Sequence, residues 1–265
     1  MTIKDNAYNN YMRICVISDL HTRYEVAEQI INKERNNVDK FVFLGDYFDE
    51  YDDENDNFAS TAKTAEFIQP LLHDEKFVFL IGNHDLHYIF NVPTIRCVGS
   101  YSDEKFQVIN DILTDNDWDK LQWTYTADDW LFSHSGINYK GNFTTEQYDE
   151  ILNQELLNVI NEDAAAEYLK YPGGKFWIKT VESPVYAEIE DSKPYNQIFG
   201  HTMLYNWQVK FYDNYKTYDI DTHNQHYAII NTQNNNVDII PSGYYHRYHR
   251  REIQWLLKTK QFKNL

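Results

Sequence analysis

The first half of the chain alternates short, continuous apolar runs with segments of helical periodicity. The apolar runs at 13–18, 40–44 and 76–81 are bounded by turn residues, as buried strands usually are. Between them, apolar side chains recur at helical spacing over 24–36 and 59–72, which predicts two helices. Continuous apolar strands separated by helices indicate parallel strands joined by right-handed crossovers, with both faces of their sheet covered.

The second half of the chain has a different pattern. Short apolar runs at 130–133 and 197–199 predict two more buried strands, and helical spacing over 144–171 predicts an insertion between them. From 207 to 240, aromatic and β-branched residues alternate with turn residues, which predicts a series of hairpins. Parallel strand–helix units followed by antiparallel strands fit an α+β fold of two packed mixed sheets flanked by helices.

The chain is predicted to form one domain with a C-terminal extension. No internal repeat and no compositionally simple linker interrupts residues 1–243. Residues 244–265 are basic and also contain aromatic and aliphatic side chains, so they could bind a partner as an amphipathic helix or pack on their own domain. We favour packing on the domain, because its acidic surface would attract the basic side chains.

Charge and composition narrow the function further. The 265 residues carry a formal net charge of −17, which argues against nonspecific nucleic-acid binding because such binding requires a basic surface. The acids are concentrated in 46–56, which we interpret as a solvated face rather than as a third metal site. No run is apolar enough to span a bilayer or to act as a secretory signal. Cys15 and Cys97 do not form a disulfide framework, so the reducing cytoplasm is the expected compartment.

Polar side chains that can bind a metal follow each of the five predicted buried strands. In chain order they are Asp19 and His21, Asp46 and Asp49, Asn83 and His84, His134, and His201. In open α/β sheets, functional sites form where the loops at the carboxyl ends of the strands converge. Asp19 and His21 are separated by one residue, so an extended backbone points both side chains the same way. Mixed nitrogen and oxygen ligands suit manganese, iron or zinc rather than a metal selected by thiolates.

The order of these motifs resembles that of a known enzyme family. The sequence contains DxH at 19–21, GDxxD at 45–49, GNHD at 82–85, a single His in FSHSGI, and GHT at 200–202. Together they resemble the calcineurin-like metallophosphoesterases, and within them the branch of protein serine/threonine phosphatases and bacterial diadenosine tetraphosphate hydrolases. The likeness extends to about Asp221 and implies a four-layer α/β/β/α sandwich.

The resemblance also implies two divalent metal ions, with manganese favoured over iron or zinc. The implied ligands are Asp19, His21 and Asp46 for the first ion, and Asp46 as a bridge with Asn83, His134 and His201 for the second. A hydroxide held by the metals would attack phosphorus in line. His84 would protonate the leaving oxygen, and Asp49 would orient its imidazole.

Two positions depart from the family's pattern. Met203 stands where the nuclease and cyclic-nucleotide phosphodiesterase branches have a second His, so a nuclease is disfavoured. Glu50 stands where the phosphatases have an arginine that binds the phosphate, so another cation is expected to do this. Arg96 and Lys179 are the candidates for substrate binding, although a lysine provides a point charge rather than the bidentate fork of an arginine.

The implied activity is metal-dependent hydrolysis of a phosphomonoester, on a phosphorylated small molecule or a phosphoprotein. Two alternatives stay open: hydrolysis of a nucleotide anhydride such as diadenosine tetraphosphate, and a non-catalytic binding scaffold. A scaffold does not need His84 and Asp49, so their presence favours an enzyme. Five other histidines match no family ligand and are interpreted as surface or structural residues: His87, His223, His226, His246 and His249.

Overall fold

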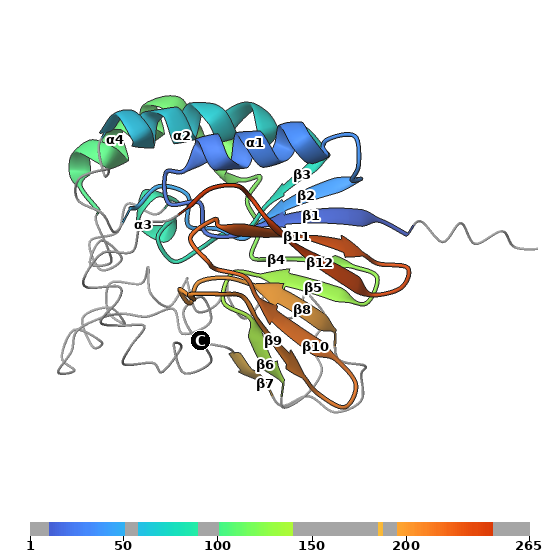
Figure 1. The fold of residues 1–265 in the computed structure, drawn as a ribbon. Coiled ribbons are helices and arrows are strands. Elements are labelled where there is room, and N and C mark those ends of the chain that lie inside the picture. The colour runs from blue at the N-terminus through green and yellow to red at the C-terminus, as the bar shows by residue number, and fades with distance from the viewer. Residues whose placement is uncertain (1–10, 51–57, 90–100, 140–184, 188–194, 246–265) are drawn as a thin grey trace, which may run out of the picture.

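A computed structural model of the chain describes residues 11–50, 58–89, 101–139, 185–187 and 195–245. These residues form two five-stranded mixed sheets, a two-stranded sheet and five helices. The two larger sheets pack on each other, and the helices lie against the first sheet (Figure 1). No helix in these ranges is long and apolar enough to cross a membrane.

The first sheet has the strand order β12-β11-β1-β2-β3. Its strands are β1 (Arg13–Ile17), β2 (Lys40–Phe43), β3 (Phe77–Phe79), β11 (His226–Asn231) and β12 (Asn236–Pro241). Strands β1, β2 and β3 are parallel, with Cys15 opposite Phe41 and Phe43 opposite Phe79, whereas β11 and β12 are antiparallel to their neighbours. The three parallel strands predicted in the first half of the chain are therefore confirmed.

The second sheet has the strand order β4-β5-β8-β10-β9. Its strands are β4 (Thr124–Ala127), β5 (Trp130–Ser133), β8 (Asn196–Phe199), β9 (Gln208–Phe211) and β10 (Lys216–Asp219), while β6 (Ile137–Tyr139) and β7 (Val185–Ala187) form the small sheet. The predicted hairpin series is two hairpins in different sheets, because β10 pairs in parallel with β8 whereas β11 pairs with β1. Strands β5 and β8 are also parallel, so their carboxyl ends point the same way.

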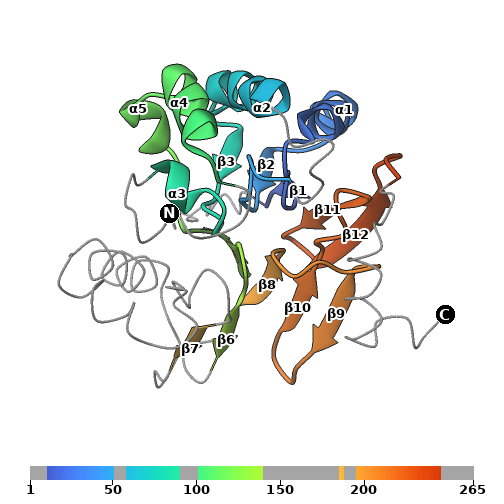
Figure 2. The ribbon, with the colours of Figure 1, turned by 90° about the vertical axis from the view of Figure 1, so that its left-hand side faces the viewer.

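The helices are α1 (Tyr24–Glu34), α2 (Phe58–Leu71), α3 (Leu86–Ile89), α4 (Asp103–Ile112) and α5 (Asp115–Trp118). Figure 2 shows α1, α2 and α4 side by side above the first sheet. Helices α1 and α2 confirm the two predicted from periodicity. Helix α4 lies where the apolar pattern predicted no element, although its start signal is present: the Ser102 side chain accepts a hydrogen bond from the Lys105 backbone at 3.1 Å.

Alternate residues of β1 contribute to two hydrophobic cores. Cys15 and Ile17 belong to the core beneath the helices, whereas Ile14 and Val16 pack in the core that contains Trp130 of the second sheet. Successive side chains of a strand point to opposite faces, so this buried strand supports both layers.

The predicted class, an α+β fold with two mixed sheets flanked by helices, is confirmed. Within the described ranges, helices cover the first sheet (Figure 2). The predicted insertion at 144–171 and residues 246–265 of the predicted extension lie outside these ranges. The proposed domain boundary after residue 243 stays a prediction.

Candidate metal centre

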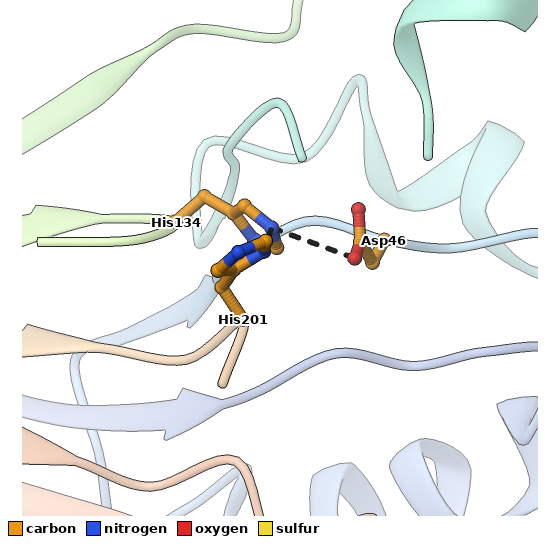
Figure 3. Close-up of side chains that lie close together, drawn as sticks. All are labelled: Asp46, His134 and His201. Atoms are coloured by element: carbon orange, nitrogen blue, oxygen red, sulfur yellow. Dashed lines mark hydrogen bonds and ion pairs between the residues drawn. The ribbon is translucent and has the colours of Figure 1, made fainter. Parts of the chain in front are cut away.

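The parallel strands of both sheets end at one edge of the molecule, and their loops bring the predicted ligands together. The turn after β1 is joined to the loop after β2 by a 2.8 Å hydrogen bond from the His21 N–H to the Asp46 carbonyl. The turn after β8 is joined to the first sheet because the His201 N–H donates to the Asp19 carboxylate, 2.9 Å from Oδ1. Asp46 and His201 therefore lie in one cluster with His134, as Figure 3 shows; Asp46 and His134 are buried and His201 is partly exposed.

The backbone of these loops adopts conformations that residues other than glycine rarely take. Positive φ angles occur at Asp19 (25°), His21 (43°), Asp46 (56°) and His201 (68°). Such strained residues are concentrated at functional sites, where the surrounding structure holds them in place. A glycine is also required at position 200, directly before His201, because a Cβ there would clash with the Asp19 carboxylate.

Three predicted ligands form a triangle of atoms that can bind a metal. Asn83 Oδ1 lies 2.9 Å from His134 Nε2 and 3.0 Å from His201 Nδ1, and the two imidazole nitrogens are 3.1 Å apart. Asp46 Oδ2 lies 3.4 Å from His134 Nε2 and extends the group toward the first sheet (Figure 3). Neighbouring ligands of an octahedral ion, each at about 2.1 Å, are separated by about 3.0 Å, which matches the spacing of the triangle.

A second group of possible ligands consists of Asp19, His21 and Asp46. Each offers one atom, and the three atoms lie within 4.8 Å of one another. The Asp46 Oδ2 atom lies 3.9 Å from His21 Nε2 and also faces His134 in the first group. One carboxylate therefore lies between the two groups, which is the position that a bridging ligand requires.

Backbone carbonyls determine which imidazole nitrogens can bind a metal. His134 Nδ1 lies 2.8 Å from the Leu44 carbonyl oxygen, and His21 Nδ1 is hydrogen-bonded to the Asp49 carbonyl oxygen. A carbonyl only accepts hydrogen bonds, so each Nδ1 must carry the proton. This tautomer turns the Nε2 lone pair of both rings toward Asp46, and such second contacts are typical of metal-binding histidines.

Burial disfavours the charged forms of these ligands in the absence of a cation. It raises the pKa of Asp19 and of Asp46 well above the usual aspartate value. It lowers the pKa of His21 and of His134 well below the usual imidazole value. A divalent ion would stabilise the ionised carboxylates of Asp19 and Asp46. It would also bind the neutral imidazoles, the form that burial favours at His21 and His134. The donor set therefore fits divalent metal ions.

Beside the ligands, a buried pair is formed by Asp49 and His84. His84 Nδ1 lies 2.9 Å from Asp49 Oδ2, and the Tyr88 hydroxyl donates to Asp49 Oδ1 at 2.6 Å. His87 Nε2 lies 3.0 Å from the same Oδ2, and Lys105 Nζ lies 3.7 Å from Oδ1. Burial tends to raise the pKa of Asp49, but the hydrogen bond from His84 and the adjacent imidazole of His87 outweigh burial and hold this pKa below its usual value.

The same contacts set the protonation of His84. Burial tends to lower the pKa of this imidazole, but the carboxylates of Asp46 and Asp49 outweigh burial and raise the pKa to about 9. Divalent ions bound to Asp46 would reduce the part of this pKa increase that comes from Asp46, whereas the hydrogen bond to Asp49 would persist. His84 is therefore suited to hold a proton at neutral pH and to donate it.

Several residues of the site were not predicted from the sequence. His87 lies in α3, three residues beyond His84, and this short spacing was the available signal. Lys105 comes from α4, and nothing in its local sequence indicates that it lies near Asp49. His87 and His223 are buried, so of the two interpretations, surface or structural, only the structural one fits them; His226 is partly exposed, and His246 and His249 lie outside the described residues.

Asp85, the last residue of GNHD, holds the loops of β2 and β3 together. Its carboxylate accepts hydrogen bonds from the backbone N–H groups of Asp46, Tyr47 and Gly82, each at 2.8 Å. Burial raises the pKa of Asp85 to about 7, although the three donors oppose this shift. Asp85 thus positions Asp46 without being one of the predicted ligands.

We expect Asp85→Ala to destabilise the metal-free protein by about 3–5 kcal/mol, because buried N–H groups that lose their acceptor each cost about 1–3 kcal/mol. Urea unfolding of the metal-free protein measures this directly. Asp85→Asn keeps one acceptor oxygen, so its free energy of unfolding is expected to lie between those of Asp85→Ala and the wild type. Equal unfolding midpoints for Asp85→Ala and wild-type protein would contradict the role assigned to this carboxylate.

The acidic run differs from its interpretation as a solvated face. Residues 46–50 are buried, so that interpretation is wrong for this part, and residues 51–56 lie outside the described residues. Glu50 forms an ion pair with Arg23, with 2.5 Å between Oε2 and Nη2. Arg96 and Lys179, the predicted substrate contacts, also lie outside the described residues.

Solved structures of known proteins share features of this fold at low sequence identity. The fold resembles that of the cold-active protein-tyrosine phosphatase of a psychrophilic Shewanella species, with a TM-score of 0.51 and 13% identity, covering 87% of this chain and 78% of that chain. A protein serine/threonine phosphatase from Saccharomyces cerevisiae has a TM-score of 0.47 and 13% identity, with 91% and 83% of the two chains covered. A candidate diadenosine tetraphosphatase has a TM-score of 0.47 and 12% identity, with 90% and 96% covered.

No curated protein matches the sequence. The family model for calcineurin-like phosphoesterases matches residues 12–248, a range that contains every ligand of the candidate centre. This match spans most of the chain, and the two mixed sheets agree with the fold of that family. The protein therefore belongs to the calcineurin-like phosphoesterase family.

Proposed function

We propose that this protein is a phosphatase that uses two divalent metal ions to hydrolyse phosphomonoesters. One observation carries the proposal: two groups of possible ligands share the Asp46 carboxylate, and the buried pair of Asp49 and His84 lies beside them. Family membership supports phosphoester hydrolysis, and the shared carboxylate supports two ions rather than one.

The ligands divide between the two ions. Asp19 and His21 would hold the first ion, whereas Asn83, His134 and His201 would hold the second, and Asp46 would contact both. The ions would provide positive charge beside the phosphate and would lower the pKa of a bound water. Oxygen and nitrogen donors without thiolates suit manganese, iron or zinc, and the resemblance to the family favours manganese among them.

His84 would act as the general acid. Its backbone N–H donates to Asp46 Oδ1 at 2.8 Å, which fixes the residue next to the proposed bridge. Its Nδ1 is engaged by Asp49, so Nε2 is the nitrogen that would give a proton to the leaving oxygen. Asp49 would stabilise the imidazolium before the transfer, and Tyr88 fixes the orientation of the Asp49 carboxylate.

The test is turnover by protein stripped with a chelator and reloaded with manganese, iron or zinc. We expect manganese-dependent release of phosphate from an aryl phosphate and from small phosphorylated molecules or phosphopeptides, with no turnover by the stripped protein. Absence of metal-dependent turnover on all three substrates would contradict the proposal. Faster cleavage of a dinucleoside polyphosphate, with nucleotide products, would instead support the anhydride alternative.

A further inference from the structure

Arg23 and Glu50 form a buried ion pair next to the proposed metal ligands. Arg23 directly precedes α1 and is 8% exposed, and Glu50 directly follows Asp49 and is 6% exposed. The contact joins Arg23 Nη2 to Glu50 Oε2 at 2.5 Å. Two opposite charges have therefore been removed from water at the edge where the strands end, which is costly unless each finds enough partners.

The pairing leaves one donor of Arg23 unused. Its Nη1 is buried and has no hydrogen-bond acceptor in the described part of the chain. A buried donor without an acceptor is unfavourable and rare in native proteins. The side chain makes no capping hydrogen bond to α1 either, and arginine is not a preferred residue at that position of a helix. Neither the ion pair with Glu50 nor the start of α1 therefore uses Nη1.

The position of the pair relates it to the metal centre. Arg23 lies two residues beyond the proposed ligand His21, in the turn that follows β1. The turn is fixed by hydrogen bonds from the Arg23 N–H to the Leu20 carbonyl at 2.9 Å and from the Thr22 N–H to the Tyr47 carbonyl at 2.8 Å. On the other side, the Asp49 carbonyl next to Glu50 accepts from His21 Nδ1.

We propose that Arg23 is the cation that binds the substrate phosphate, with Nη1 donating to a phosphate oxygen and Glu50 holding the guanidinium through Nη2. This assignment rests on the proposed function. It accounts for Glu50 at a position where an arginine was expected: the acid is the counter-ion of a cation supplied by the turn after β1. A guanidinium suits this task, because its planar donors match phosphate oxygens.

Binding of inorganic phosphate to the manganese-loaded protein, measured by calorimetry, tests the assignment without requiring turnover. We expect Arg23→Ala to weaken phosphate binding by about ten- to a hundredfold, the factor associated with a hydrogen bond to a charged group. Arg23→Lys should recover part of the loss. Glu50→Gln keeps the cation and should retain affinity within about tenfold of the wild type. Metal content should remain that of the wild type in all three variants.

Arg23→Ala also leaves Glu50 buried without its partner, which can disturb the fold. The double variant Arg23→Ala/Glu50→Gln removes that stranded charge, and we expect it to unfold closer to the wild type while binding phosphate as weakly as Arg23→Ala. Equal losses of affinity in Arg23→Ala and Glu50→Gln would show a purely structural ion pair and overturn the assignment. Wild-type affinity in the double variant, or no phosphate binding by the wild type, would overturn it too.

The two proposals fail in different ways. If the wild-type protein binds phosphate through Arg23 but hydrolyses none of the phosphate esters, the proposed function is wrong and the assignment of Arg23 stands. If the wild type hydrolyses aryl phosphates and Arg23→Ala binds phosphate equally well, the assignment is wrong and the proposed function stands.

Discussion

Replacing Asp46 with asparagine is expected to remove bound metal and activity together. The Asp46 carboxylate faces His134 at 3.4 Å and His21 at 3.9 Å, and it is the acidic group common to both proposed ligand sets. An amide has the same shape but lacks the charge that a shared ligand provides. The ions supply several kcal/mol of transition-state stabilisation, so we expect kcat/KM to fall by about a thousandfold or more.

Metal analysis and thermal unfolding distinguish this loss from misfolding. Burial raises the pKa of Asp46, so a neutral amide should not destabilise the metal-free protein. Manganese should raise the melting temperature of the wild type and should raise that of Asp46→Asn much less. Asp238→Asn, the same change on the exposed side of β12, is the matched control and should behave as wild type. Two bound ions and retained turnover in Asp46→Asn would contradict the proposed bridge.

The parts of the site that could be predicted are those encoded locally. Each buried strand is a continuous apolar run, and the first polar residues after it include the possible ligands, so position along the chain indicated Asp19, Asn83 and His134 as candidates. Their proposed roles as ligands come from the resemblance of the motif order to the family. Parallel strands of one sheet deliver their carboxyl ends to one edge, which is why residues far apart in sequence meet there.

The parts that could not be predicted depend on contacts between loops. The apolar pattern does not reveal that Asp85 accepts hydrogen bonds from the loop after β2, because this requires β2 and β3 to be neighbours in the correct register. The pairing of Arg23 with Glu50 is of the same kind, since each is an ordinary charged residue in its own segment. The hairpins at 207–240 were recognised, but their division between two sheets is decided by their partners β8 and β1.

His84→Asn is expected to keep the metal and to lose activity selectively. The backbone N–H of residue 84 still donates to Asp46, so the ligand groups should remain intact. The substitution removes the imidazole that Asp49 engages at 2.9 Å, and with it the proposed proton donor. A positioned general acid contributes about 10²–10⁴-fold, and its contribution is largest for a leaving group that needs the proton. Alkyl phosphates should therefore lose about that factor, whereas nitrophenyl phosphate, with an acidic leaving group, should lose much less.

The measurement is kcat/KM across a series of phosphate esters, plotted against the pKa of the leaving alcohol or phenol. The slope should be steeper for His84→Asn than for the wild type, and Asp49→Asn should show a smaller change of the same sign, because Asp49 acts through the imidazole. His73→Asn is the matched control: His73 also pairs with a carboxylate, that of Asp117 at 2.6 Å, but this pair joins the turn after α2 to α5 on the helical side of the first sheet. A loss in His84→Asn that is the same for every leaving group would mean that this imidazole does not deliver the proton, and would leave it only a part in holding the site together.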